Sequence, residues 1–144
     1  MTLNATYDPD NIFAKIIRGD MPCVKILETD ATLAFMDVFP QSEGHCLIIH
    51  KQATAANLFD IDTGALSEIT ASTQTVARAV KDGLSPDGIR IMQFNGAPAG
   101  QSVYHLHFHV IPVYEGVSLG AHASGGPVEA STLEPIAEKI RAAL

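Results

Sequence analysis

Residues 104–112 read YHLHFHVIP, and this alternation of histidine with apolar residues decides the fold of the chain. Successive side chains of a β-strand point to opposite faces, so His105, His107 and His109 project from one face and the apolar residues between them from the other. The run therefore predicts a strand with one core face and one stripe of three imidazoles. Each buried imidazole needs partners for two nitrogens, so three such rings cannot all be satisfied core histidines. The stripe indicates a chemical site.

Two kinds of chemistry use such a stripe. Alternating histidines can supply nitrogen ligands to zinc or iron, although residues 91–114 contain no Asp, Glu, Lys or Arg to join them. Alternatively, a neutral imidazole, with a pKa of about 6.5, can act as a nucleophile toward phosphorus at pH 7. Directly upstream, residues 95–102 (NGAPAGQS) offer two glycines, amides and a hydroxyl that can donate to an anion. These residues alone leave both chemistries open.

The spacing of apolar residues predicts the elements that precede the stripe. Steps of three and four indicate a short helix that ends at Gly19 and a long amphipathic helix from about residue 60 to Gly83. Short β-prone runs bounded by turn residues predict strands, at residues 23–28, 32–36, 46–50, 88–95 and 103–113.

The end of the chain follows a different pattern. Four glycines and a proline predict a flexible connector at 116–127, and apolar residues beyond it predict an amphipathic helix at about 131–143. Ser131 and Glu134 have the spacing of a capping box at its start. Because the strands come in runs around one long helix, without regular βαβ alternation, we expect an α+β domain with a mostly antiparallel sheet.

Length and charge restrict the classes of partner. The 144 residues suffice for one domain whose core needs no disulfide or structural metal. The net charge of −7 disfavours duplex nucleic acid and anionic membranes as partners. No stretch is apolar enough to span a bilayer and residues 1–11 lack a secretory pattern, so we expect a cytoplasmic protein in which Cys23 and Cys46 are reduced thiols.

The residues around the stripe resemble the histidine triad family of nucleotide hydrolases and transferases. The signature of that family is His-φ-His-φ-His-φ-φ, with φ apolar, and residues 105–111 match it at every position. The likeness includes IFAKIIRGDMP at 12–22 and LAFMDVFPQSEGHCLII at 33–49, which look most like the nucleotide-binding, phosphoramidase-like branch. The resemblance implies a polar segment, a family domain and a variable tail, at residues 1–10, 11–113 and 114–144.

The resemblance also implies a role for each candidate residue. His107, the central histidine, would attack the α-phosphorus and form a nucleotidyl-imidazole intermediate. His109 and His45 would contact phosphate oxygens and position that ring, while His105 would orient it. The remaining candidates would bind the substrate, with Ser102 and Gln101 on the phosphate and leaving-group side, Asp37 on the ribose hydroxyls, Asn95 as an active-site amide, and Ile12, Phe13, Ile16, Phe35 and Val38 around the base.

The resemblance thus predicts an enzyme that cleaves an ester or phosphoramidate of a nucleoside 5′-monophosphate, with a purine nucleotide such as AMP as the substrate. Two alternatives stay open. The first is a nucleotide-binding regulatory module with incidental hydrolysis, and the second is a metal-dependent hydrolase that uses the three histidines as ligands.

Two further expectations follow from the family. Many bacterial relatives carry a zinc-binding Cys-x-x-Cys at the start of the first helix, but Asn11 and Ala14 stand there in this chain, so we expect no zinc and no other cofactor. The family also forms homodimers in which a sheet of five strands continues across both protomers. The long helix and the strand at 88–95 would then meet their symmetry mates.

Overall fold

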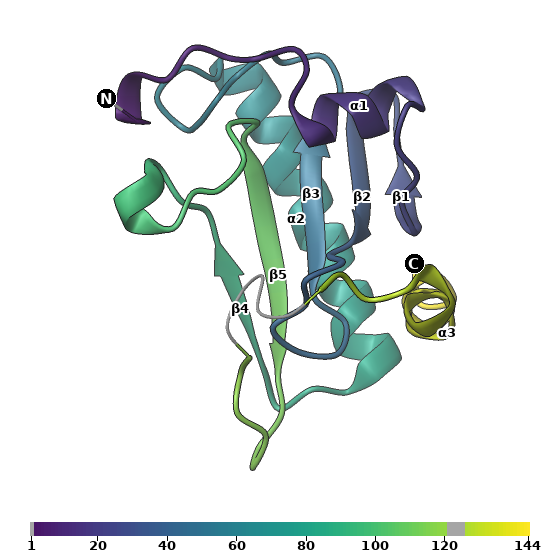
Figure 1. Cartoon of the computed structure of the whole chain (residues 1–144). Helices are drawn as coiled ribbons and strands as arrows, with labels where there is room; N and C mark the ends of the chain where they lie inside the picture. The colour runs from purple at the N-terminus through teal and green to yellow at the C-terminus, as the bar shows by residue number, and fades with distance from the viewer. Residues whose placement is uncertain (1, 121–125) are drawn as a thin grey trace.

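A computed structural model describes residues 2–120 and 126–144. In this part of the chain, five strands form one antiparallel sheet in the order β1-β2-β3-β5-β4 (Figure 1). The strands are β1 (Lys25–Glu28), β2 (Thr32–Met36), β3 (Cys46–His50), β4 (Gly88–Met92) and β5 (His107–Val113), and the α-helices are α1 (Ile12–Arg18), α2 (Thr63–Leu84) and α3 (Ala130–Arg141). The expected α+β class, with an antiparallel five-stranded sheet and one long helix, is confirmed.

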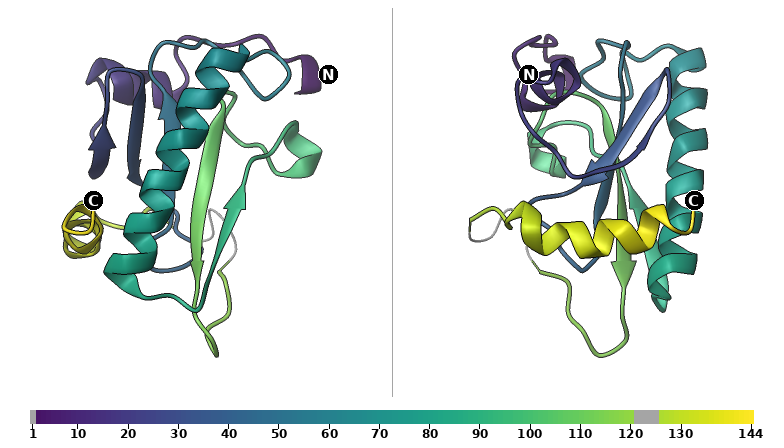
Figure 2. Two further views of the ribbon diagram at one scale, coloured as in Figure 1. Left: turned by 180° about the vertical axis from the view of Figure 1, so that it is seen from behind. Right: turned by 90° about the vertical axis from the view of Figure 1, so that its right-hand side faces the viewer.

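The alternation of side chains along the central strands builds a core on each face of the sheet. On one face, β2 and β3 send Met36 and Ile48 toward α2 and α3. On the other face, the residues that directly precede these two along the same strands, Phe35 and Leu47, pack with Phe13 of α1. Figure 2 shows α2 running along the sheet, with α3 crossing it near its C-terminal end. The central strands are therefore buried on both sides.

A side-chain cap and a glycine cap fix the two ends of α1, and the end at Gly19 is the predicted one. Asn11 is the N-cap, and its side-chain oxygen accepts hydrogen bonds from the backbone N–H groups of Phe13 and Ala14. Gly19 ends the helix in the left-handed conformation, with φ of 84°. The helix is thereby fixed over the face of the sheet that carries Phe35 and Leu47.

The predicted end of the long helix is wrong. The helix starts after the N-cap Asp62 and continues through Gly83 to Leu84, and Ser85 takes the left-handed cap position with φ of 50°. A Cβ atom on Gly83 would lie 2.5 Å from the backbone oxygen of Lys139 in α3. The glycine thus lets two helices approach closely, which a sequence pattern within one helix does not reveal.

Three strands are shorter than predicted, because pairing partners end before the β-prone runs do. The ladder of β5 with β3 begins at the pair Ile49–His107, so residues 103–106 lie outside the strand. The N–H of Leu106 donates instead to the carbonyl of Ala55, at 2.9 Å. Likewise β4 stops at Met92, before the short η2 turn (Ala97–Ala99), and β1 starts at Lys25, where its register with β2 shifts.

The tail docks back on the domain. Helix α3 starts at Ala130, one residue before the expected start, and Ser131 makes no capping bond, so the predicted capping box is wrong. Glu134 instead pairs with Arg141, whose guanidinium also donates to the carbonyl of Lys25 in β1. Part of the predicted connector, residues 121–125, lies outside the described residues.

Two remaining expectations concern the cysteines and the membrane. Both Cys23 and Cys46 are free thiols, and burial raises the pKa of the Cys46 thiol to about 12. Among the described helices, none is both long and apolar enough to cross a bilayer.

Candidate active site

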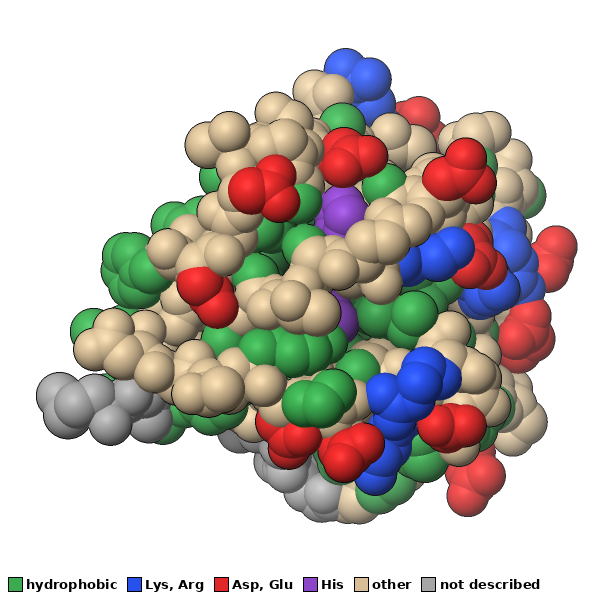
Figure 3. All heavy atoms as spheres, turned by 90° about the horizontal axis from the view of Figure 1, so that it is seen from above, with side chains coloured by type: hydrophobic (Ala, Val, Ile, Leu, Met, Phe, Trp, Pro, Cys, Tyr) green, Lys and Arg blue, Asp and Glu red, His purple; other side chains and the backbone are tan. Residues whose placement is uncertain are grey.

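The histidine stripe faces the side of the sheet that α1 covers. A cavity of about 540 Å³ opens there, and its wall includes Phe13 of α1, Phe35 of β2, and His107 and His109 of β5. Figure 3 shows only small areas of histidine between neighbouring side chains, and His105, His107 and His109 are all buried. The imidazoles are therefore set back in the molecule, where hydrogen bonds to protein atoms can fix their orientation.

The hydrogen bond of His107 fixes which ring nitrogen carries the proton. Its Nδ1 lies 2.7 Å from the carbonyl oxygen of His105, and a carbonyl can only accept, so Nδ1 is the donor. In the neutral ring the lone pair is then on Nε2. The edge of the Phe13 ring packs against this imidazole, with ring centroids 4.9 Å apart. His107 thus has the tautomer that a nucleophile at Nε2 requires.

His45 and His109 form a second ordered pair. Nδ1 of His45 accepts from the backbone N–H of Gln41 at 3.0 Å, so the neutral His45 ring carries its proton on Nε2. This Nε2 lies 2.9 Å from Nδ1 of His109 and 3.3 Å from a carboxylate oxygen of Asp37. Nδ1 of His109 is therefore an acceptor, and its proton sits on Nε2. His109 can offer an N–H to a phosphate oxygen.

His105 is held at both nitrogens. Its Nε2 lies 3.1 Å from the carbonyl oxygen of His50 and donates to it, so its Nδ1 accepts from the Tyr7 hydroxyl at 2.8 Å. Burial, together with nearby His107 and His50, lowers the pKa of His105 to about 4, although the bond to the His50 carbonyl opposes this. The ring is therefore neutral at pH 7 and serves to hold the site together.

This ordered set of imidazoles agrees with the comparison to known proteins. The family model for the HIT domain matches residues 18–116. The chain belongs to the HIT family. An adenosine 5′-monophosphoramidase, hnt1, of Schizosaccharomyces pombe is 36% identical over 130 residues, which cover 90% of this chain and 94% of that protein.

Solved structures of HIT proteins share the fold. A Hit-like protein from Bartonella henselae, described as involved in cell-cycle regulation and solved with an unknown ligand, superposes with a TM-score of 0.88 at 47% identity. The alignment covers 96% of this chain and 99% of that one. A zinc-bound histidine triad protein from Mycobacterium smegmatis has a TM-score of 0.80 at 31% identity, with 93% and 92% of the two chains covered.

The structure brings most of the predicted substrate residues of the HIT domain to the cavity. They are the apolar set Ile12, Phe13, Ile16, Phe35 and Val38, together with Asp37 and Ser102. The wall also includes Met21, Pro22 and Cys23, which were not predicted as site residues although they lie two to four positions after the α1 cap Gly19. Pro127, from the tail, completes it, and nothing in the local sequence marks that residue.

Two of the predicted substrate residues, Gln101 and Asn95, do not line the cavity, and neither do the predicted catalytic residues His45 and His105. The buried Gln101 side chain accepts from the N–H of Gly96 and donates to the carbonyls of Ala56 and Val103. The Asn95 amide accepts from the N–H of Leu58 and exchanges hydrogen bonds with Gln93. In this HIT domain both amides hold the shape of the loop that precedes the histidine strand.

The donor groups do not fit a bound metal. Asp37, His45 and His109 offer ligand atoms within 4.8 Å of one another. Binding through Nε2 of His45 would, however, require its proton on Nδ1, where the Gln41 N–H already donates. Both nitrogens of His105 are bonded within the protein, and the Asn11 side chain caps α1.

Proposed function

We propose that this HIT protein cleaves a nucleoside 5′-monophosphate from an amine or another leaving group, with Nε2 of His107 as the nucleophile. The observation that carries the proposal is the 2.7 Å bond from His107 Nδ1 to the His105 carbonyl, which keeps the lone pair on Nε2. The phosphoramidase name of the hnt1 relative supports a nucleotide hydrolase. For this chain, the covalent intermediate stays a prediction.

The reaction has two steps. In the first, a bond forms between His107 Nε2 and the α-phosphorus, while the bond from phosphorus to the leaving nitrogen breaks and the amine departs with a proton from solvent. In the second, water attacks the same phosphorus, the bond to Nε2 breaks, and the proton of the water returns to solvent. His109 and Ser102 would donate to the phosphate oxygens as charge develops, which is where fixed donors contribute most.

The cavity supports a nucleoside as the bound group. Its wall is mostly apolar, which suits the faces of a base, and a purine such as adenine is the predicted occupant. Asp37 lies at the wall with one carboxylate oxygen near His45 and the other accepting from the N–H of Phe39. Its predicted contact with ribose hydroxyls would add to these bonds.

We propose chemistry without a metal, because His45 and His105 use their ring nitrogens within the protein. Chelation should therefore leave turnover unchanged. A loss of turnover after chelation, restored by one added metal, would favour the metal-dependent hydrolase. The cytoplasmic location expected from the sequence stays a prediction.

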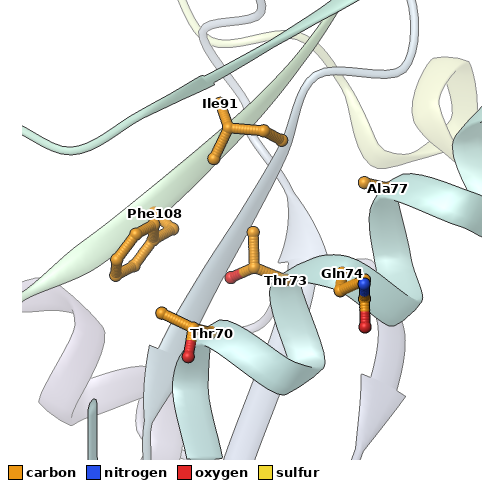
Figure 4. Close-up of a pocket in the computed structure, with 6 residues that line it drawn as sticks. All are labelled: Thr70, Thr73, Gln74, Ala77, Ile91 and Phe108. Atoms are coloured by element: carbon orange, nitrogen blue, oxygen red, sulfur yellow. The ribbon is translucent and has the colours of Figure 1, made fainter. Parts of the chain in front are cut away.

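The edge strand supports a homodimer. Strand β4 pairs only with β5 in the described sheet, and Ile91 on it is 47% exposed. An apolar groove runs beside this edge between Thr73 and Ala77 of α2 and Phe108 of β5 (Figure 4). Pairing of β4 with the same strand of a second copy would continue the sheet. Ile91→Asp should shift the protein toward monomer in light scattering, whereas an unchanged mass would contradict this interface.

The direct test of the function is turnover of an adenosine 5′-phosphoramidate by the wild type and by His107→Ala. We expect the substitution to lower kcat by roughly 10³-fold or more, because the nucleophile is gone. Binding of AMP, measured by calorimetry, should survive. Wild-type turnover in the variant would overturn the proposal, and saturable binding without turnover by the wild type would favour the regulatory module.

A further inference from the structure

The polar segment that precedes the HIT domain reaches the histidine cluster. The hydroxyl of Tyr7 donates to Nδ1 of His105 at 2.8 Å, and the two ring centroids are 5.3 Å apart. The segment is fixed a second time where the buried Asn57 side chain donates to the carbonyl of Leu3 at 3.2 Å. The family model begins only at residue 18, so this contact comes from outside the matched domain.

His105 lies just before the start of β5, so its own side-chain bonds help to hold it. Strand β5 begins at His107, and its ladder with β3 begins at the pair Ile49–His107. The carbonyl of His105 therefore lies outside the ladder, yet it is the group that accepts from His107 Nδ1. Residue 105 is fixed by the neighbouring bond from Leu106 N–H to the Ala55 carbonyl and by the two hydrogen bonds of its own ring.

We propose that Tyr7 is a positioning residue for the catalytic imidazole. By donating to Nδ1 it holds the His105 ring, and so the carbonyl that keeps the proton of His107 on Nδ1 and the lone pair on Nε2. Tyr7 does not line the cavity, so it acts on the chemical step and not on nucleotide binding. The kinetic part of this inference rests on the proposed function.

The chain offers a matched pair of variants for the test. Tyr7→Phe removes the hydroxyl but keeps the ring that packs on His105. Tyr104→Phe removes a buried hydroxyl that has no hydrogen-bond partner among the described residues, three positions before His107. Thermal melting of both variants establishes that each is folded before its activity is compared.

Two readouts separate positioning from a general effect on the fold. In Tyr7→Phe, kcat for the adenosine phosphoramidate should fall about two- to tenfold, as for the loss of one neutral hydrogen bond, with KM changed less than about twofold. In nitrogen NMR spectra of the unliganded protein, the His105 Nδ1 resonance should shift and the His107 signals should move toward a mixture of tautomers. Tyr104→Phe should leave kcat and both sets of signals unchanged.

Several outcomes would overturn the inference. One is an unchanged kcat in Tyr7→Phe, and another is an equal loss in both variants. A third is a loss of kcat while the His107 ring nitrogens keep their wild-type signals. If the wild type does not turn over the phosphoramidate, the proposed function fails by itself, and the NMR comparison of the two variants still decides whether Tyr7 orders the imidazoles.

Discussion

The two faces of the sheet are built from the same three strands but do different work. Toward α2, residues such as Met36, Ile48 and Val110 pack into a continuous apolar core. Toward α1, their neighbours include Leu47 and His109, which line the cavity. Adjacent residues of one strand therefore point into the core and into the cavity in turn. Substitutions at adjacent positions should then affect mainly the stability of the fold in one case and also the activity in the other.

The largest effect on stability should come from the α2 face. Ile48 is fully buried there, so Ile48→Ala should lower the free energy of unfolding by about 2–5 kcal/mol in denaturant titrations. The folded variant should keep its KM. The adjacent Leu47→Ala should lose comparable stability and also raise KM, because Leu47 lines the cavity. Equal KM values in the two variants would break the comparison between the faces.

On the histidine face, burial of His105 should make the fold less stable at low pH. His105 has a pKa of about 4 when folded and about 6.5 when unfolded, so between these values the unfolded chain binds more protons. Above pH 6.5 the His105 ring is neutral in both the folded and the unfolded state and should not change the free energy of unfolding. As the pH drops to 4, that free energy should fall by about 3 kcal/mol. Unfolding titrations across this window measure the slope, and His105→Asn should flatten it. An equally steep slope in that variant would assign the effect to other groups.

A smaller loss of stability is expected at the contact where α3 crosses α2. Gly83→Ala would place a Cβ against the Lys139 carbonyl and should cost about 1–3 kcal/mol by overpacking. Helix propensity alone predicts the opposite sign, a gain of about 1 kcal/mol, because Gly83 lies inside the helix. The sign of the change in unfolding free energy therefore decides between the two.

The smallest effect should come from the helix that covers the cavity. Asn11→Ala removes the cap of α1 and should cost about 1 kcal/mol of stability. Because Ile12 and Phe13 of that first turn line the cavity, KM should rise as well. Asn11→Ser, which can also cap, should restore both values, and an unchanged KM in the alanine variant would show that the first turn does not fray.

Local patterns in the sequence predict what depends on neighbours along the chain. The bounds of β2 and β3, the end of α1 at Gly19 and the common face of the three histidines are all of this kind. The apolar residues Ile12 and Phe35, which the family resemblance assigns to the base, line the cavity.

Contacts between distant segments account for what was missed. The role of Gly83 depends on α3, the start of β5 depends on where β3 ends, and the Tyr7–His105 bond spans 98 positions. Gln101 and Asn95 were assigned to the substrate through the family resemblance, whereas in the structure their side chains bond to neighbouring protein groups. A polar residue near a site is not thereby part of its surface.

The central claim is that His107 Nε2 forms a covalent bond to phosphorus, and the stereochemistry of hydrolysis tests it most directly. The substrate is an adenosine phosphoramidate made chiral at phosphorus by one sulfur atom, hydrolysed in water enriched in ¹⁸O. Each in-line displacement inverts the configuration, so attack by His107 followed by attack by water predicts net retention. Net inversion would show that water attacks directly, and it would contradict the account.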